Sequence, residues 1–533
     1  MSLRLLAAGI AAVLSVLGAA AAQHAHDAGM NHGDVGKVRF ENSCAPSVQA
    51  DLARAVAMLH SFWYSAGEAA FRGVLEKDPG CAVATWGIAS ILMLNPLAGA
   101  GSTPKGAEAA QAAIDLGRTT GAKTQRERDY IEAVAAYYQD WARRPESVRQ
   151  ESRSNAFEAL ATRYPDDDEA RIFSALYIAG TQSQSDQSFL AYARAASILE
   201  HEFAKYPDHP GISHYLIHVY DAPPLAEQGL PYARRYAGLA PAAPHALHMP
   251  SHIFTRVGAW NESAATNLRA VSAAISGNEP GEAFHATDYA VYAYLQEGRD
   301  NAARAAMDNA LKLKVAPPYT LQTPYASASM PARLAVERGD WRAATQLAPA
   351  AVTLPYSLAI TWFARALGAA RLGDIAAAER DAAELVPLHQ ALIAAKNTYW
   401  ATEVEVQQLA ASAWIALARH DNDEALKSMR QAADLEDSHE KHIVTPGRIL
   451  PARELLGDML LEAGQPELAL KEYEASAHRE PNRFRGYSGA ARAANGAGDH
   501  DKAASYYRRL LALAKDANSE RPELAEARAY VTR

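Results

Sequence analysis

The sequence predicts an all-α fold, a right-handed α-solenoid of repeated helix–turn–helix units, and three observations support this prediction. Long stretches are rich in Ala, Leu, Glu and Arg, which favour helices, and contain few β-branched runs. Short turns of one form separate the predicted helices: a glycine, then a polar or aromatic residue, then an Ala-rich segment. These turns recur at a fixed interval, because Gly339 is as far from Gly373 as Gly464 is from Gly498. The interval is about 34 residues, a period that is typical of a repeat array built of helix pairs.

The composition of the 533-residue chain is that of an ordinary soluble protein. It is 49% hydrophobic and 21% charged, which excludes wholesale disorder, a collagen-like fibre and a polytopic membrane protein. The formal net charge is -9, and Lys and Arg do not cluster along the sequence. We therefore expect no nucleic-acid partner, because such a partner requires a basic patch on one face.

The first residues predict export. Residues 1–22 combine Arg4, an apolar run from Leu5 to Leu17 and a small-residue cleavage site, which is the pattern of a secretory signal peptide. A membrane span is the alternative, but the run is short for one and ends in small residues. We expect a periplasmic or secreted protein with no stable membrane span after cleavage. Residues 23–40 should form a flexible His-rich tail, and residues 41–533 the solenoid.

The two cysteines, Cys44 and Cys81, predict one disulfide in an oxidising compartment. The bond would close a loop of 37 residues and contribute about 3–4 kcal/mol to stability by restricting the unfolded chain. Two separate buried thiols are the alternative.

Side chains within the repeats follow one pattern. One unit carries a small, a small, an aromatic and a proline residue at Gly457, Ala469, Tyr473 and Pro481. Three of these positions recur exactly one period later as Ala491, Ala503 and Tyr507. Small residues let two helices approach closely, and proline ends the second helix because it lacks an N–H. The chain therefore resembles tetratricopeptide-repeat (TPR) proteins over most of residues 45–525, with its clearest repeats at 209–300, 325–385 and 450–515.

A narrower resemblance concerns five short segments. They are LHSFWY (59–64), DPGCAVATWG (78–87), HPGISHYLIHVYD (209–221), HALHMPSHIF (245–254) and VTPGRILPARELLGD (444–458). These segments are similar to those of a family of exported bacterial TPR proteins that has no settled activity. The resemblance implies the fold and export, and it implies no particular chemistry.

Histidines indicate the candidate site. His214 and His218 share one helix face because they are four residues apart, and His248 and His252 repeat this pair one period later. Imidazole pairs on one helix face are suitable ligands for Zn or Cu. The sequence therefore predicts a metal site formed by these four histidines at equivalent places in consecutive repeats.

A second set of residues is predicted to line the concave groove of the solenoid. In the proteins that the chain resembles, positions 2, 5 and 9 of each first helix face this groove. The predicted groove residues are His245, Arg256, His285, Asp288 and Arg333. The arginines could hold a ligand carboxylate, and Asp288 could complete a mixed metal site. Two alternatives remain: the histidines contact a ligand in the groove or only pack against tyrosines, and the arginines lie on a solvated helix face.

The N-terminal tail offers further possible metal ligands. The sequence shows no recognised catalytic motif. His24, His26, Met30 and His32 are residues that copper accepts, with a flexible polar tail as the alternative. The metalloprotease motif HExxH is absent, and no nucleophile–His–acid triad stands out. Whether the protein is an enzyme stays undecided at this stage.

The leading hypothesis is an exported solenoid that binds a protein or peptide partner through a His-lined concave groove, which is the common use of repeat solenoids. The alternative is a Zn- or Cu-binding protein, or a metalloenzyme, that uses the clustered histidines. A third hypothesis is metal handling without catalysis, in which the tail delivers ions to the groove.

Overall fold

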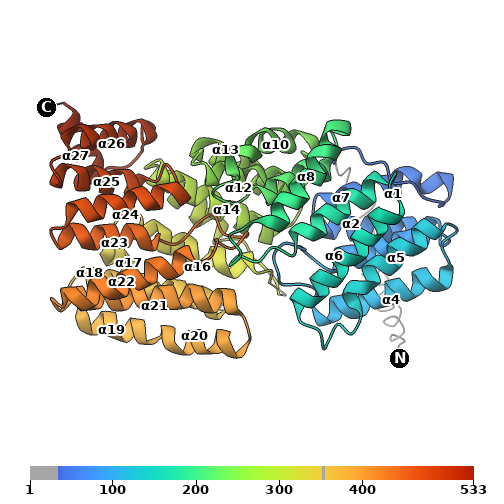
Figure 1. Cartoon of the computed structure of the whole chain (residues 1–533), viewed down its shortest axis with the longest axis horizontal. Coiled ribbons are helices and arrows are strands. Elements are labelled where there is room, and N and C mark those ends of the chain that lie inside the picture. The colour runs from blue at the N-terminus through green and yellow to red at the C-terminus, as the bar shows by residue number, and fades with distance from the viewer. Residues whose placement is uncertain (1–33, 318, 351–353, 533) are drawn as a thin grey trace, which may run out of the picture.

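The computed structural model describes residues 34–317, 319–350 and 354–532, and within these ranges all regular structure is helical. Figure 1 shows the N-terminal half of the chain at one end of the long axis and the C-terminal half at the other. The predicted all-α solenoid is confirmed. The predicted signal peptide and the tail residues His24, His26, Met30 and His32 lie outside the described residues.

The N-terminal helices are η1 (Pro46–Val48), α1 (Gln49–His60), α2 (Tyr64–Lys77), α3 (Val83–Leu92), α4 (Pro104–Thr120), α5 (Gln125–Tyr138), α6 (Glu146–Arg163), α7 (Asp168–Ala179) and α8 (Leu190–Lys205). The central helices are α9 (Pro210–Val219), α10 (Ala226–Leu239), α11 (Pro244–His248), α12 (Pro250–Arg256), α13 (Trp260–Ser276), α14 (Pro280–Gln296), α15 (Asp300–Ala310), α16 (Gln322–Val336) and α17 (Trp341–Thr345). The C-terminal helices are α18 (Pro355–Arg371), α19 (Ile375–Ala383), α20 (Leu385–Ala394), α21 (Thr398–Ala418), α22 (Asn422–Asp437), α23 (Ala452–Glu462), α24 (Pro466–Arg479), α25 (Phe484–Gly496), α26 (His500–Leu513) and α27 (Pro522–Val531).

The repeated glycines make the turns between paired helices, as the sequence predicts. All six have positive φ, between 63° and 80°: Gly258, Gly298, Gly339, Gly373, Gly464 and Gly498. A side chain is strained in this conformation, which explains the glycine at these six turns, whereas His420 takes a positive φ in the turn between α21 and α22. In three units an aspartate follows and caps the second helix. For example, Asp340 accepts a hydrogen bond from the N–H of Ala343 (3.0 Å).

Small residues within the helix pairs permit close packing. A Cβ at Gly489 would lie 2.3 Å from the ring of Tyr473, and a Cβ at Gly457 would lie 2.8 Å from the same ring. Tyr507 fills the equivalent place in the next unit and is fully buried. The repeat pattern in the sequence is therefore a packing pattern between neighbouring helices.

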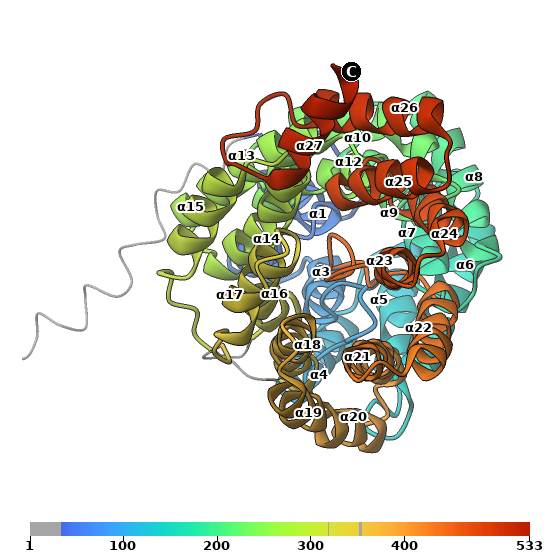
Figure 2. The ribbon, with the colours of Figure 1, turned by 90° about the vertical axis from the view of Figure 1, so that its left-hand side faces the viewer.

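The solenoid winds tightly and contacts itself. Figure 2 shows the helices following one another around a central axis. Helices that are one turn of the superhelix apart are in contact: α1 packs against α9, and α14 packs against α25. Hydrogen bonds and ion pairs also join successive turns of the superhelix. The indole N–H of Trp260 donates to the carbonyl oxygen of Asn482 (2.7 Å), and Arg521 pairs with Asp300. The interior of the solenoid is consequently narrow.

A buried loop occupies this interior. Residues 439–451, here called the central segment, connect α22 to α23, and every one of them is buried. Their backbone groups have partners elsewhere: the Tyr289 hydroxyl donates to the carbonyl of Thr445 (2.9 Å), and Arg333 donates to that of Gly447 (2.6 Å). Val444 belongs to the N-terminal core and Leu450 to the C-terminal one. The open groove expected from the sequence is thus filled along this stretch.

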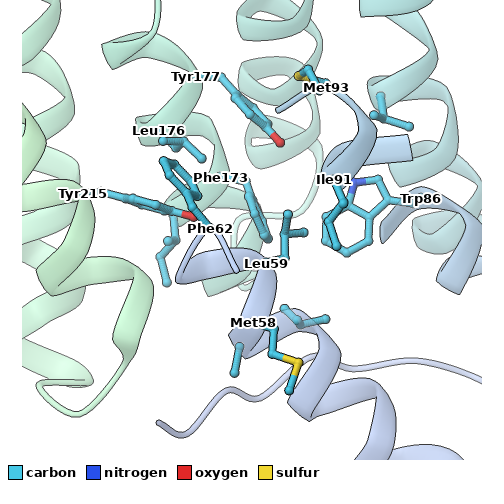
Figure 3. Close-up of a cluster of buried hydrophobic side chains, with 14 of the residues drawn as sticks. Met58, Leu59, Phe62, Trp86, Ile91, Met93, Phe173, Leu176, Tyr177 and Tyr215 are labelled. Carbon is cyan, nitrogen blue, oxygen red and sulfur yellow. The ribbon is translucent and has the colours of Figure 1, made fainter. Parts of the chain in front are cut away.

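The N-terminal core is rich in aromatic side chains, and Figure 3 shows part of it. The rings of Trp86 and Phe173 meet edge to face with centroids 5.2 Å apart, and Phe62 lies between this core and the histidines, 4.5 Å from the ring of His214. Aromatic pairs of this kind stabilise a core beyond simple burial. The first repeat therefore supports the candidate site directly.

The predicted disulfide is present between Cys44 and Cys81, whose Cα atoms are 4.7 Å apart. It joins the chain just before η1 to the turn that precedes α3. None of the helices in the described part of the chain is long and apolar enough to span a membrane.

Candidate metal centre

Six histidines meet inside the solenoid, and they include all four predicted metal ligands and two predicted groove residues. We call them the six-histidine cluster: His214, His218, His245, His248, His252 and His285. They are carried by α9, α11, α12 and α14, the first helices of three consecutive repeats. The fold brings them together because first helices of neighbouring repeats lie side by side. Only His245 is partly exposed; the other five are buried.

The cluster divides into two sets of three. Set one is His214, His218 and His245, and set two is His248, His252 and His285. Within each set, one ligand atom from every residue lies within 4.8 Å of the others. The sets also touch, with ring centroids 5.8 Å apart for His218 and His252, and 6.1 Å apart for His245 and His248.

Hydrogen bonds fix the tautomers of His248 and His252 in set two. The Nδ1–H of His248 donates to Oδ1 of Asn267 (2.7 Å), and the amide of Asn267 is oriented by its own donation to the carbonyl of Ser263 (2.7 Å). The Nδ1–H of His252 donates to Oδ2 of Asp221 (2.8 Å). Each neutral ring therefore carries its lone pair on Nε2.

The two lone pairs of set two face each other. Nε2 of His248 and Nε2 of His252 are 3.1 Å apart. Two acceptors at this distance repel unless a cation lies beside both of them. Metal-binding histidines are typically held this way, with the outer nitrogen donating to a carboxylate or carbonyl oxygen. The arrangement therefore suits a metal ion better than it suits an empty pair of rings.

Burial keeps the rings of set two neutral. Desolvation lowers the pKa of His248 well below its usual value, lowers the pKa of His252, and lowers the pKa of His285 to about 3. Neutral imidazole is the form that binds a metal ion. At neutral pH set two therefore offers nitrogen ligands rather than positive charges.

In set one, only some of the outer ring nitrogens have a hydrogen-bond partner of the kind seen in set two. The Nδ1–H of His214 donates to the backbone carbonyl of His60 (2.6 Å), and Nε2 of His214 lies 3.1 Å from Nε2 of His218. Nδ1 of His245 faces a carboxylate oxygen of Glu282 at 3.6 Å. Nε2 of His245 is buried and has no hydrogen-bond partner among the described residues.

Asp221 is the charged residue that contacts set two from outside the ring of histidines. Besides His252, it accepts hydrogen bonds from Arg256 (2.7 Å) and from Lys441 of the central segment (3.3 Å). Burial alone would raise the pKa of Asp221, but Lys441 and Arg256 hold it well below its usual value. Burial lowers the pKa of Lys441 to about 8. The predicted groove residue Arg256 is therefore a buried partner of Asp221, not a residue of a solvated face.

The other two predicted groove residues, Asp288 and Arg333, pair with each other. Their side chains meet at 2.5 Å, and Asp288 also accepts from the hydroxyl of Ser329 (2.8 Å). Both are buried. Asp288 is not a member of either histidine set. Arg333 and Ser329 both contact Oδ1 of Asp288, whereas its Oδ2 is buried without a hydrogen-bond partner among the described residues. The structure therefore pairs Asp288 with Arg333 and does not group it with the histidines as a ligand of a mixed metal site.

A further group of possible ligands lies near set one. His60, Glu169, His209 and Tyr215, here called the Glu169 network, are joined by hydrogen bonds. Nε2 of His60 and Nε2 of His209 each lie near one oxygen of Glu169, at 2.9 and 3.0 Å. Tyr215 contacts Nδ1 of His60 (2.9 Å), and the N–H of Ile212 donates to Nδ1 of His209 (3.4 Å). All four ring nitrogens are thus engaged with protein groups.

Sequence reasoning missed the outer partners of the cluster: Asp221, Asn267, Glu282 and Lys441. Each is a single polar residue with no recurring spacing, so no repeat signal could identify it. Asp221 follows directly after the first histidine pair, at the end of HYLIHVYD, and this proximity is the one available signal. Lys441 lies 220 residues beyond Asp221 in the sequence, and only the folded interior joins them.

Comparisons with known proteins assign no function. No family model matches the chain, and no curated protein matches it. One similar solved structure is the Cut9–Hcn1 hetero-tetramer of the APC/C, at 12% identity and TM-score 0.29, covering 91% of this chain and 95% of that one. Another is the TPR domain of P58(IPK), at 15% identity and TM-score 0.21, covering 69% and 98%. The assignment to the TPR type of solenoid rests on the chain's own regularly spaced repeats.

Proposed function

We propose that the protein binds a divalent transition-metal ion, Zn²⁺ or Cu²⁺, at the six-histidine cluster. One observation carries the proposal: Nε2 of His248 and Nε2 of His252 are 3.1 Å apart, and both are fixed as acceptors by Asn267 and Asp221. Nitrogen ligands suit both ions. The ligands come from consecutive repeats, so a bound ion would also tie those repeats together.

Elemental analysis of the purified protein tests this proposal. The mature chain, prepared without a His tag, is compared with the variant His248→Ala/His252→Ala. A matched control, His201→Ala/His478→Ala, removes two exposed imidazoles elsewhere. We expect stoichiometric metal in the wild type and the control and loss of tightly bound metal in the cluster variant. Wild-type protein that holds no metal, and takes up none from added ZnCl₂ or CuCl₂, would disprove the proposal.

Thermal stability provides a second readout. A ligand that binds only the folded state stabilises it by about 4 kcal/mol when its free concentration is about 1,000 times Kd. Removal of metal with a chelator should therefore lower Tm in the wild type, and added metal should restore it. The His248→Ala/His252→Ala variant should show little response to either treatment.

We propose that the protein works outside the cytoplasm. The predicted signal peptide of residues 1–22 and the pairing of Cys44 with Cys81 support this location, because disulfides persist in oxidising compartments. Cell fractionation, followed by N-terminal sequencing of the mature chain, tests it. A chain that stays in the cytoplasm with Met1 retained would contradict export.

Binding of a protein or peptide partner is the second candidate function, and one feature of the surface favours it. A hollow of about 800 Å³ lies between residues 37–41, 163–169 and 205–209. Its lining carries both signs of charge, including Arg163 and Lys205 as well as residues 166–168, which are all Asp. A photo-crosslinker placed at Arg163 should capture a partner whose purified form then binds the protein, whereas one at Gln390 should not. Equal labelling from both positions would disfavour the hollow.

A further inference from the structure

The six-histidine cluster is a duplicated site. His214 and His218 of set one correspond to His248 and His252 of set two, one repeat later. In each set the third histidine comes from the next first helix: His245 from α11 for set one and His285 from α14 for set two. The third histidines are spaced more widely than one repeat period, in part because α13 has 17 residues where α10 has 14. The two sets therefore have the same arrangement of histidines in consecutive repeats.

The two sets are adjacent and share an element. Helix α11 carries His245 for set one and His248 for set two, and the rings of these residues are 6.1 Å apart. His218 and His252 approach even more closely, with ring centroids at 5.8 Å. The rings of one set therefore contact those of the other.

The two sets differ in whether their imidazole nitrogens can satisfy one another by hydrogen bonding when no cation is bound. In set two, two fixed acceptors face each other, so the pair of His248 and His252 is unsatisfied. In set one, no hydrogen bond in the described part of the chain fixes Nδ1 of His218, so its Nε2–H can donate to His214. Set one can therefore satisfy its helix pair by itself, although Nε2 of His245 still has no partner among the described residues.

Charge near the two sets is also unequal. Set two is held directly by the carboxylate of Asp221, which contacts His252 at 2.8 Å, whereas Glu282 is 3.6 Å from His245 in set one. A first cation in set two would also repel a second one in set one, and this repulsion is strong in a poorly solvated interior. This repulsion weakens whichever site fills second. The charge of Asp221 is shared with Arg256 and Lys441, so set two is favoured by the direct contact of Asp221 with His252 and by its two fixed acceptors.

We propose that the cluster binds two divalent transition-metal ions, one in each three-histidine set, and that set two fills first with the higher affinity. This inference rests on the proposed function and adds the stoichiometry and the order of filling. The six histidines are then one two-metal centre made by duplication of a repeat, with set two as its tight site and set one as its weaker site.

Zinc titration of three matched proteins tests the proposal. The background is the full mature chain with His24, His26 and His32 replaced by Ala, so that the tail does not contribute ligands. The wild-type cluster is compared with His214→Asn/His218→Asn and with His248→Asn/His252→Asn, using ZnCl₂ in calorimetry and equilibrium dialysis. Asparagine keeps a polar side chain of similar reach, and circular dichroism verifies that each variant folds.

We expect two equivalents of Zn²⁺ in the wild-type cluster, with the second bound at least about 10-fold more weakly because of the first charge. The set-one variant should bind one equivalent at the higher affinity, and the set-two variant one equivalent at the lower affinity. Saturation of the wild type at one equivalent would overturn the two-site proposal while leaving metal binding intact. Binding of none would overturn both, and a tighter site retained in the set-two variant would reverse the order. A variant that fails to fold is replaced by the single substitution His218→Asn or His252→Asn.

Discussion

The solenoid holds two buried groups of possible ligands that are similar in size: the Glu169 network, which begins at α1, and set two, on the central helices α11, α12 and α14. In the Glu169 network and in set two, three potential ligand atoms lie within 4.8 Å of one another. In the network, however, His60 and His209 direct their Nε2–H groups at the carboxylate of Glu169. In set two, the Nδ1–H groups point outward and the Nε2 lone pairs point at each other.

The difference shows that proximity of ligands does not define a metal site. The Glu169 carboxylate already accepts a hydrogen bond from each of two imidazoles, and the network is complete as a structural element. Two imidazole acceptors at 3.1 Å are incomplete until a cation joins them. The direction of each hydrogen bond separates the two cases. Stability should therefore depend mainly on the Glu169 network, and metal binding on set two.

The largest expected effect on stability comes from His60→Ala. It removes one of the two hydrogen-bond donors of the buried Glu169 carboxylate and leaves a cavity beside Phe173, and the loss of a large buried side chain of this kind costs about 3–5 kcal/mol. Metal content should not change, because the oxygen of His60 that holds His214 belongs to the backbone and remains in the variant.

The matched variant is His252→Ala. Asp221 keeps Arg256 and Lys441 as partners, so the loss of stability should be smaller, while tightly bound metal should be lost. Denaturant unfolding and elemental analysis of both variants provide the measurement. If His60→Ala released the metal as completely as His252→Ala, the proposed division between a structural and a metal-binding region would fail.

Substitution of Glu169 by Gln should have a smaller effect that depends on pH. Burial opposes ionisation of Glu169, but His209 and His60 lower its pKa to about 2, from an ordinary value of 4.5. A lowered folded-state pKa stabilises the protein above the unfolded value, and this contribution is lost as pH falls from 4.5 towards 2. At about 1.4 kcal/mol for each pKa unit, it is about 3 kcal/mol at neutral pH.

The measurement is the difference in free energy of unfolding between the wild type and Glu169→Gln. It should be largest at neutral pH and become smaller at each step below pH about 4.5. A difference that stays constant across this range would show that the carboxylate charge contributes nothing.

Repeat spacing was sufficient to predict the helix pairs and the histidine pairs. The repeat interval is local information: a glycine that needs positive φ, a small residue under an aromatic ring, and two imidazoles four residues apart. These features depend only on one repeat and its neighbour. For the same reason His245 and His285 could be placed beside the pairs, as members of the first helices that follow.

The tight winding of the solenoid, which brings distant helices into contact, could not be predicted from the repeat spacing. How tightly helix pairs wind depends on small rotations that accumulate over many repeats. The burial of Arg256 and Arg333 follows from this winding and from the central segment, whose contacts with them lie 184 and 114 residues further along the chain. The pairing of Asp288 with Arg333 joins α14 to α16, and the repeat spacing gave no sign of it. The tail residues His24, His26, Met30 and His32 stay a prediction.

The smallest of the expected effects is also the most specific, and it concerns Asn267. Loss of an outer partner of a metal-bound histidine typically costs about 10–100-fold in affinity, so Asn267→Ala should weaken metal binding by that factor. Asn267→Asp keeps an oxygen for the Nδ1–H of His248 and should retain affinity, although it loses the donor to Ser263. Competition with a chromophoric chelator measures both.

The pair of Asn267 variants separates hydrogen bonding from packing. Both alter the contact with Ser263, but only Asn267→Ala removes the acceptor that lies 2.7 Å from Nδ1 of His248 and leaves the hydroxyl of Ser251, at 3.5 Å, as a weak partner. His248 can then move its hydrogen to Nε2 and donate to His252, as His218 can donate to His214 in set one. Set two would then satisfy itself without a cation and lose the feature that distinguishes it. Equal losses of affinity in the two variants would mean that packing alone, and not the fixed tautomer, prepares this site for metal.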